Sequence, residues 1–595
     1  MGNTIQQQLI YYTKQAVKEL YEADLPDNQI TIQETRKEFE GQLTIVVFPI
    51  TRFSRKSPEA TGNDIGSYLL RQLPQLTAFN TIKGFLNLSL SDAYWTSLFT
   101  TAVMHEKFGQ FPANGRKIMV EYSSPNTNKP LHLGHIRNNL LGYSVAAILT
   151  AYGYDVIKAN LVNDRGIHIC KSMLAWQRWG NGETPEASGL KGDHLVGKYY
   201  VLFDKAYKQE IDGLKAQGLT EEEAKKQAPI IRAAQQMLQQ WESGDEAVIG
   251  LWKTMNGWVY AGFDQTYTRL GVDFDKYYYE SDTYLLGKDI INEGLEKGVF
   301  FRKEDNSVWI DLTDDGLDEK LVLRGDGTSV YMTQDMGTAQ LKYDDFGMDE
   351  SIYVVGNEQD YHFKVLFLIL EKLGKPWGKG LFHLSYGMVD LPSGKMKSRE
   401  GTVVDADDLM DEMMATAKRR TEELGKTEGL PDLEKAQLYD TIGMGALKYF
   451  LLKVEPKKRL LFDPNESIDF QGHTGPFIQY THARIQSVLT KGGGHAPQAI
   501  AAPDAPLSAS ERDLIQLLGN YPATVEAAAR EFSPAHVANY GYEVAKQYNK
   551  FYHEETILKA EDETVRSFRL HLSAATARII ANSMQLLGIE VPDRM

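Results

Sequence analysis

Residues 120–143 read VEYSSPNTNKPLHLGHIRNNLLGY, and this stretch decides the fold of the chain around it. An apolar, β-type run leads into the turn-rich loop SSPNTNKP, and a helix is expected to follow the loop. The apolar positions of that helix keep helical spacing at Ile136, Leu140, Tyr143 and Ala147. A loop at a strand-to-helix junction lies at a helix amino end, where backbone amides bind anions. The stretch therefore predicts a βαβ unit with an anion site at the carboxyl end of its first strand.

Two histidines, His132 and His135, fall in the first turn of this expected helix. Residues three apart share one helix face, and Gly134 between them leaves room for a flat ligand or a backbone to approach. Imidazoles at this place can donate hydrogen bonds to phosphate oxygens. A plainer interpretation is a helix-start pair with one ring capping the backbone and the other solvated, and the tetrapeptide alone favours it.

A basic stretch far along the chain favours the ligand-binding interpretation of the two histidines. Residues 395–401 read KMKSREG and follow a strand-like run and the turn PSG. Together with HLGH at 132–135, they resemble the paired HIGH and KMSKS signatures of class I aminoacyl-tRNA synthetases. The residues SSPN before the first signature and REGTVV after the second are similar to those of arginyl-tRNA synthetases. The resemblance extends from the amino-terminal module to Met595.

Length and composition fit a multidomain globular protein. The chain has 595 residues, 42% of them hydrophobic and 24% charged, which is too long for one core. Its single cysteine, Cys170, cannot form an internal disulfide, and no run of apolar residues is long enough to span a membrane. The start, MGNTIQQQLIYY, lacks the features of a signal peptide, so a cytoplasmic protein is expected. The net charge of −16 does not exclude nucleic acid, because binding depends on where positive charge is concentrated.

The expected fold class is α/β with four parts. They are a small α/β domain at 1–108, a Rossmann-like parallel-sheet catalytic domain at 109–404 with a charged helical insertion at about 185–270, a helical connection at 405–465, and an all-α anticodon-binding domain at 466–595. By the resemblance, the first part contacts tRNA; the alternative is a stabilising appendage.

Three short β-branched or aromatic runs after the insertion predict that the sheet domain resumes, at 309–312, 329–333 and 351–355. Neither a G-x-G-x-x-G nor a G-x-x-x-x-G-K-[ST] motif stands at the first strand-to-helix turn. Their absence argues against a hydride-transfer enzyme and against a P-loop NTPase.

Activation of an amino acid by ATP needs orientation and positive charge at the phosphates, and little covalent chemistry. By the resemblance, His132 and His135 contact ATP, and Lys395 supplies a second, mobile clamp. ATP would bring Mg²⁺ with it, and no structural metal is expected.

The second signature departs from the family pattern at one position. Ser398 stands where KMSKS has its second lysine, and Lys397 precedes it. Many arginyl enzymes lack that lysine, and a lysine just before HIGH is thought to substitute, which points to Lys129 here. Lys397 remains an ATP-binding candidate; its alternative is a solvated loop charge.

Further ATP-binding positions follow from the resemblance alone. They are Gly134, His362, Gly387, Met388 and Val389. For His362, the alternative is a core histidine whose ring is satisfied by neighbours.

Selection of arginine requires acidic residues, because a guanidinium is planar and permanently charged. By the resemblance, Asp335 and then Glu121 bind the guanidinium, while Asn126 and Gln359 hold the α-amino and carboxylate end. Tyr331 completes the set, and its spacing of four from Asp335 puts both on one side of a helical turn. Taken singly, each residue has a structural alternative such as packing, capping or turn polarity. Lysine lacks the planar fork, so no editing domain is required.

The last third of the chain offers the nucleic-acid partner. The segment DFQGHTGPFIQYTHARIQSVL resembles the start of the helical anticodon-binding domain of arginyl enzymes, in which Tyr480 and Arg484 suit base stacking and phosphate contact. A basic cluster just before it predicts a phosphate track, the alternative being ordinary surface lysines: Lys448, Lys453, Lys457, Lys458 and Arg459.

The expected function is ATP-dependent ligation of L-arginine to tRNA(Arg), through an arginyl adenylate, by a monomer. Two rivals remain open. A nucleotidyltransferase with an HxGH signature would form an adenylate without tRNA, but it would not need the long helical domain. A synthetase-like tRNA-binding protein without catalysis is opposed by His132, His135 and Lys395, although Ser398 keeps it open.

Overall fold

The computed structural model describes most of the chain and divides it into two compact units. The described residues are 5–36, 38–390, 404–425, 429–493 and 505–595. The first unit comprises 1–108, 488–520 and 547–576, and the second 109–487, 521–546 and 577–595. Among the described residues, none of the helices combines the length and hydropathy that a membrane span requires.

The first unit contains an antiparallel sheet of four strands, ordered β1-β2-β4-β3. The strands are β1 (Ile32–Glu34), β2 (Leu43–Val46), β3 (Leu76–Ile82) and β4 (Phe85–Leu90). Helix α3 (Pro58–Gln72) packs on β3 and β4, and α1 (Ile5–Tyr21) packs on α3. Helix α20 (Ala509–Gly519) lies against α4 (Asp92–Leu98), where Arg512 forms an ion pair of 3.0 Å with Asp92.

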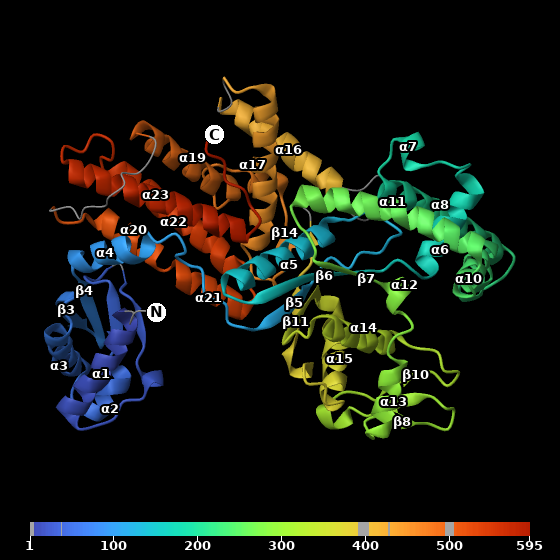
Figure 1. Cartoon of the computed structure of the whole chain (residues 1–595), viewed down its shortest axis with the longest axis horizontal. Helices are drawn as coiled ribbons and strands as arrows, with labels where there is room; N and C mark the ends of the chain where they lie inside the picture. The colour runs from blue at the N-terminus through green and yellow to red at the C-terminus, as the bar shows by residue number, and fades with distance from the viewer. Residues whose placement is uncertain (1–4, 37, 391–403, 426–428, 494–504) are drawn as a thin grey trace. The chain divides into compact units, whose positions relative to one another are not determined.

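The second unit is built on a parallel sheet of five strands, ordered β12-β11-β5-β6-β7 (Figure 1). The strands are β5 (Lys117–Glu121), β6 (Asp155–Val162), β7 (Lys276–Tyr279), β11 (Glu350–Gly356) and β12 (Leu381–Tyr386). The strand order reverses between β5 and β11. In open parallel sheets, ligands bind outside the carboxyl ends of the strands at such a reversal.

Helices cover this sheet, as its apolar strands require. Helix α5 (Leu133–Ala151) joins β5 to β6, and α15 (Asp360–Lys372) joins β11 to β12. On one face, Met119 and Ile157 form a core with side chains of α14 (Tyr331–Phe346). The predicted βαβ unit is therefore present, with the amino end of α5 at the reversal point.

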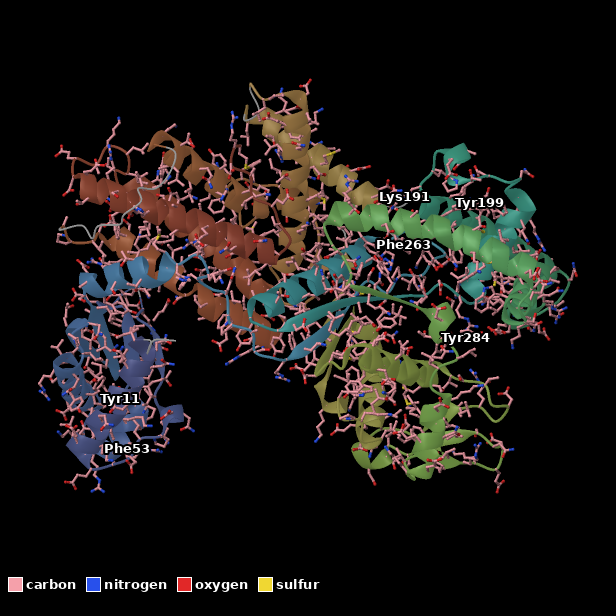
Figure 2. All side chains as sticks on the ribbon, viewed as in Figure 1. Tyr11, Phe53, Lys191, Tyr199, Phe263 and Tyr284 are labelled. Carbon is pink, nitrogen blue, oxygen red and sulfur yellow. The ribbon has the colours of Figure 1, made fainter. Side chains whose placement is uncertain are left out.

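A group of helices is inserted between β6 and β7 (Figure 1). It consists of α6 (Ile167–Trp179), α7 (Pro185–Ser188), α8 (Gly192–Ala216), α9 (Glu221–Gln227), α10 (Pro229–Glu242) and α11 (Glu246–Leu270). Tyr199 on α8 and Phe263 on α11 are buried within the group (Figure 2). Most of its charged residues are exposed, as a solvated outer face requires.

One of these predicted strands is wrong, and another is a strand of a different sheet. Residues 329–333 include the first turn of α14: the Thr333 hydroxyl accepts a hydrogen bond from the Val330 amide, and this local contact starts a helix. Residues 309–312 overlap β9 (Val308–Ile310), which belongs to a separate antiparallel sheet. That sheet pairs β9 with β8 (Phe301–Arg302) and β10 (Lys320–Leu323).

Helices dominate the chain after the second signature, as predicted. They are α16 (Ala406–Glu423), α17 (Asp432–Leu452), α18 (Pro464–Ser467), α19 (Gly475–Lys491), α21 (Tyr521–Glu531), α22 (Ala535–Glu554) and α23 (Glu563–Leu586), in addition to α20. A short parallel pair, β13 (Val389–Asp390) and β14 (Leu460–Leu461), joins the end of the catalytic region to this helical part.

Replacing Gly142 by alanine is expected to destabilise the second unit. A Cβ there would lie 2.3 Å from Cγ of the buried Tyr122 ring, so helix or ring must shift, at a cost of about 1–3 kcal/mol. Gly250→Ala in α11 is the matched control, because its Cβ would meet open space and alanine favours the helix. Calorimetry should show a lower Tm for Gly142→Ala only; equal Tm values would contradict the close packing.

Candidate active site

The loop between β5 and α5 is strained and tightly held. Ser123 and Ser124 have φ values of 77° and 46°, which non-glycine residues rarely adopt. The buried Asn138 of α5 accepts a hydrogen bond of 2.5 Å from the Ser123 amide and donates one of 2.7 Å to the Val354 carbonyl on β11. The side chain of Ser123 also lies 2.7 Å from the Tyr267 hydroxyl. Strain of this kind persists where its surroundings fix it, and it is frequent at functional sites.

The two predicted histidines lie together at the amino end of α5. Their ring centroids are 3.9 Å apart. The His132 Nδ1 accepts a hydrogen bond from the Gly134 amide, and the His135 Nδ1 accepts one from the His132 amide. Both Nδ1 atoms are acceptors, so each neutral ring carries its proton on Nε2, where it can be donated to a ligand. The helix-capping interpretation and the ligand-donor interpretation therefore apply to the same pair of rings.

Both rings are kept neutral. Burial, and then the Lys129 charge, lowers the pKa of His132 to about 4. Burial, followed by His132 and Lys129, places the pKa of His135 well below its ordinary value. Lys129 thus lies close to both rings, and none of the described carboxylates is within ion-pair distance of it. Its ammonium group, which pairs with none of the described carboxylates, can therefore bind the anion of a ligand.

After the second signature, the described structure resumes at a point next to the first signature. Lys395 and Lys397 lie outside the described residues. The chain resumes at Val404, whose carbonyl accepts a hydrogen bond of 3.0 Å from the Leu133 amide, and Asp405 forms an antiparallel bridge with His132. The end of the segment that carries KMKSREG is therefore attached to HLGH.

The predicted adenosine-binding backbone is linked to α5 through the loop before β14. The Gly387 amide donates to the Pro456 carbonyl, and Leu460 donates to the Met388 carbonyl. The buried Arg137 guanidinium donates 2.9 Å hydrogen bonds to the carbonyls of Pro456 and Lys458. Arg137 therefore fixes the loop before β14 against residues 387–389, of which Val389 begins β13. Sequence reasoning missed Arg137, although three polar residues, RNN, in an apolar helix were a usable signal.

The two predicted guanidinium ligands both have partners within the chain. Glu121, at the end of β5, forms a buried ion pair with Lys342 of α14. Asp335, about two turns before Lys342 on α14, lies 2.6 Å from Nε2 of His362. Burial would lower the pKa of Lys342, but Glu121, Tyr353 and Asp335 outweigh burial and raise it. Glu121 and Asp335 thus act on the same ammonium group and lie on one side of the sheet.

A further carboxylate, Glu280, completes this acidic region and was missed by sequence reasoning. It starts α12 (Glu280–Thr283), directly after β7. Burial raises its pKa, with Arg165 opposing and Asp164 and Asp335 adding to the rise. A lone glutamate at a strand end carries no distinctive sequence signal, so only the fold brings it toward Asp335.

The remaining predicted arginine ligands lie at the carboxyl ends of strands or at the start of α14. Asn126 bridges Asn163, beyond β6, and Gln359 follows β11 in a short 3-10 turn. Tyr331 is the first residue of α14, with 78% of its surface exposed. All three are exposed to solvent, and Asn126 and Gln359 follow the two strands, β5 and β11, between which the strand order reverses.

The predicted phosphate track is partly wrong. Lys448 is buried and donates to the Gly588 carbonyl, and burial lowers its pKa to about 8. Lys453 donates to the His473 carbonyl. Lys457 and Lys458 lie on the loop before β14; Lys457 lines a cavity of about 440 Å³ beside β12, and Lys458 pairs with Glu455. From the sequence alone, an exposed lysine cannot be distinguished from a buried lysine that donates hydrogen bonds.

The predicted anticodon residues share one face of α19. The Arg484 guanidinium lies 4.9 Å from the centre of the Tyr480 ring, at the distance of a cation–π contact. Such a pair presents an aromatic plane and a cation side by side, which is the chemistry that unpaired bases and their phosphates require.

Known proteins share both the sequence and the fold of this chain. Residues 99–463 match the family described as "tRNA synthetases class I (R), catalytic domain", and residues 478–595 match "DALR anticodon binding domain". The chain is 57% identical to the arginine–tRNA ligase of Bacteroides thetaiotaomicron over 99% of its own length and 100% of that protein. It is also 57% identical to the arginine–tRNA ligase of Flavobacterium psychrophilum, over 98% of each chain.

Two solved structures match the fold over almost all of their length. The arginyl-tRNA synthetase of Thermus thermophilus superimposes with a TM-score of 0.78 at 24% identity, over 100% of both chains. That of Plasmodium falciparum gives 0.74 at 18% identity, over 99% of both chains. The predicted α/β fold class and the resemblance carried by the two signatures are confirmed. The chain belongs to the arginyl-tRNA synthetases, the class I family of ATP-dependent arginine–tRNA ligases.

Proposed function

We propose that this chain activates L-arginine with ATP and transfers it to the 3′-terminal adenosine of tRNA(Arg). One observation carries the choice of amino acid: three carboxylates, Glu121 at the end of β5, Asp335 on α14 and Glu280 directly after β7, belong to one electrostatic region, since Glu121 and Asp335 both act on Lys342 and Asp335 acts on Glu280. A permanently charged, planar guanidinium is the side chain that such an acidic site favours.

The amino end of α5 would receive the ATP phosphates. His132 and His135 donate from Nε2, and the Lys129 ammonium group adds positive charge; Lys395 and Lys397 are expected to add more. The arginine carboxylate attacks the α-phosphate, its oxygen forming the new P–O bond while the bond to pyrophosphate breaks. ATP enters as its Mg²⁺ complex, which neutralises part of this charge.

Adenosine would lie beside the backbone of Gly387, Met388 and Val389, with Gly134 allowing close approach. A Cβ on Gly134 would come within 2.9 Å of the His132 ring, so a larger residue would push that ring out of place. His362 would contribute to adenosine binding, and it contacts the acidic site through Asp335.

Arginine would bind with its guanidinium against Asp335 and Tyr331, and Glu121 would act as a second carboxylate. Because Lys342 already neutralises Glu121, Asp335 is the carboxylate that would balance the positive charge of the arginine side chain. Asn126 and Gln359 would hold the α-amino and carboxylate end, close to the α5 amino terminus.

The rest of the chain would bind tRNA as a monomer in the cytoplasm, where translation uses the product. Residues 1–108 would contact tRNA outside the anticodon, residues 405–465 would connect the catalytic part to the helical part, and Tyr480 and Arg484 within 466–595 would contact anticodon bases. Lys457 and Lys458 would contact phosphates. In the second step, a ribose hydroxyl of the terminal adenosine attacks the arginyl carbonyl and AMP leaves.

Pyrophosphate exchange tests the reaction directly. With each amino acid in turn, exchange is expected only with arginine and only when tRNA is present. Exchange without tRNA would favour a nucleotidyltransferase. No exchange, with tRNA binding retained, would favour a tRNA-binding protein without catalysis.

Asp335→Ala is expected to weaken the use of arginine by about 100-fold, because loss of a desolvated charge partner costs about 3 kcal/mol. Calorimetry with an ATP analogue should show nearly unchanged nucleotide affinity. Asp344→Ala is the matched control, since the exposed Asp344 lies on the same helix and contacts only Gln340 among the hydrogen bonds described. Equal loss of arginine and ATP affinity would make Asp335 a structural residue.

Lys129→Ala is expected to slow adenylate formation by about 100-fold, since it removes a cation beside the developing phosphate charge. The affinity for arginine should change little. Lys205→Ala, on the exposed face of α8, controls for loss of a lysine. The measurement is the single-turnover rate of adenylate formation. An unchanged rate would indicate that Lys397, and not Lys129, replaces the missing signature lysine.

A further inference from the structure

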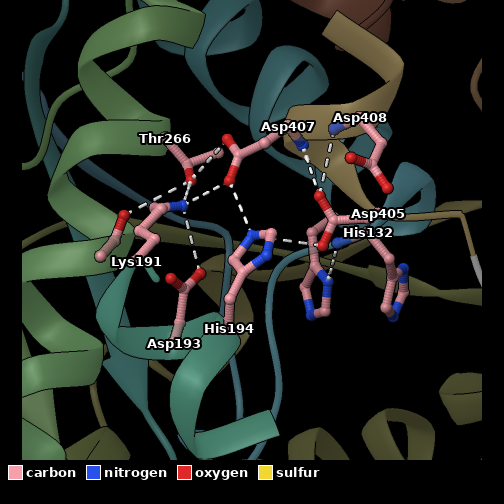
Figure 3. Close-up of polar contacts among 10 residues, drawn as sticks. His132, Lys191, Asp193, His194, Thr266, Asp405, Asp407 and Asp408 are labelled. Carbon is pink, nitrogen blue, oxygen red and sulfur yellow. Dashed lines mark hydrogen bonds and ion pairs between the residues drawn. The ribbon is translucent and has the colours of Figure 1, made fainter. Parts of the chain in front are cut away.

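A cluster of charged side chains joins the insertion to the start of α16 (Figure 3). The Lys191 ammonium lies 2.6 Å from a carboxylate oxygen of Asp407 and 3.2 Å from one of Asp193. The His194 Nε2 lies 3.1 Å from the same Asp407 oxygen and 3.5 Å from Asp405.

The two sides of the cluster belong to segments far apart in sequence. Lys191, Asp193 and His194 form the start of α8, whereas Asp405 and Asp407 form the start of α16. Helix α11 contributes Thr266, which donates to the second Asp407 oxygen at 3.2 Å. A second contact repeats the connection between α11 and α16, the 2.7 Å ion pair of Arg269 with Asp411.

Asp193, His194 and Asp407 are close enough together to hold a metal ion. The Lys191 ammonium, however, is already bound to both carboxylates and supplies the positive charge there. Lys191 therefore already supplies the positive charge of the cluster, although the buried Oδ1 of Asp193 has no hydrogen-bond partner among the described residues.

The start of α16 is attached in turn to the signature loop. The Asp405 backbone bridges His132, and the Ala406 amide donates 2.9 Å to the Leu131 carbonyl. The Asp405 carboxylate accepts hydrogen bonds from the amides of Asp407 and Asp408, so it caps α16 while its other oxygen faces His194.

Helix α8 also contacts the signature loop directly. A Cβ on Gly197 would lie 2.8 Å from the Pro130 ring, so the helix backbone packs against this loop. The segment that includes Pro130, Leu131 and His132 is thus held from two sides, by α8 and by the start of α16.

We propose that Lys191 and His194 are positioning residues for the reaction: they fix the start of α16, and through Asp405 they fix the backbone of His132 at the ATP phosphates. The inference rests on the proposed function, which places ATP at His132. Neither residue touches the substrate in this arrangement. A misplacement of about 1 Å at a reacting group costs about 100-fold in rate, so a modest shift of His132 is enough to be measured.

Charge strengthens the connection. Burial would lower the pKa of His194, but Asp407, Asp405 and Asp193 outweigh burial and the opposing Lys191 charge, and they raise it. When His194 is protonated, its imidazolium and the Lys191 ammonium lie among three carboxylates. Because the folded pKa is raised, the stabilisation by His194 is complete at low pH and is lost as the pH rises through that value.

The test compares Lys191→Met, His194→Ala and His194→Gln with the wild type in arginine- and tRNA-dependent pyrophosphate exchange. The control is Lys198→Met, because Lys198 lies on the same helix but pairs with Glu183 and does not contact α16. Circular dichroism confirms folding at the assay temperature. Lys191→Met and His194→Ala are expected to lower kcat by about 10-fold or more while KM for arginine stays within about twofold. His194→Gln, which keeps a donor for Asp407, should recover most of the rate.

An unchanged kcat in a variant with a lowered Tm would overturn the proposal, because the cluster would then be structural only. An equal change in KM for arginine would overturn it as well. If the wild type shows no arginine-dependent pyrophosphate exchange, the proposed function fails. The positioning role is then tested separately, by calorimetric binding of an ATP analogue whose α–β bridge cannot be cleaved. Weaker binding by Lys191→Met and His194→Ala than by Lys198→Met supports it, and equal affinities reject it.

Discussion

The side-chain amide of Asn138 is the contact on which the arrangement of the catalytic region depends. It binds the strained turn after β5 on one side and the β11 backbone on the other, at the point where the strand order reverses. A buried amide that satisfies two backbone groups costs more to remove than it contributes when present, because both partners would be left unpaired. The turn, the amino end of α5 and the end of β11 are therefore fixed by one side chain.

Charge is organised around this point in two different ways. On the acidic side, Glu121 is neutralised by Lys342, so the pocket is not a bare cluster of carboxylates that would repel one another. On the phosphate side, the cation Lys129 is kept apart from the carboxylates of the described residues, and the histidines beside it are neutral. The site thus separates a region suited to a cation from one suited to anions within a single edge of the sheet.

The sequence was sufficient for the βαβ unit and the family, because HLGH and its apolar helix are local features with fixed spacing. It was not sufficient for the run SVYMT, whose strand-like composition is overridden by one hydrogen bond from Val330 to Thr333. It could not predict that Lys342 would neutralise Glu121, or that Lys448 would be buried, since each depends on a partner distant in sequence. The connection of α8 to α16 was invisible for the same reason: its charges look like ordinary helix-start residues until the fold brings them together.

The capping geometry of the two imidazoles has a consequence for how the enzyme responds to acid. Each ring uses Nδ1 to accept a backbone amide, and protonation at that atom would break the first turn of α5 as well as change the charge. With the pKa of His132 near 4, neither event occurs when a cell becomes moderately acidic. The cap on the first turn of α5 and the neutral state of these two rings would then persist under such conditions.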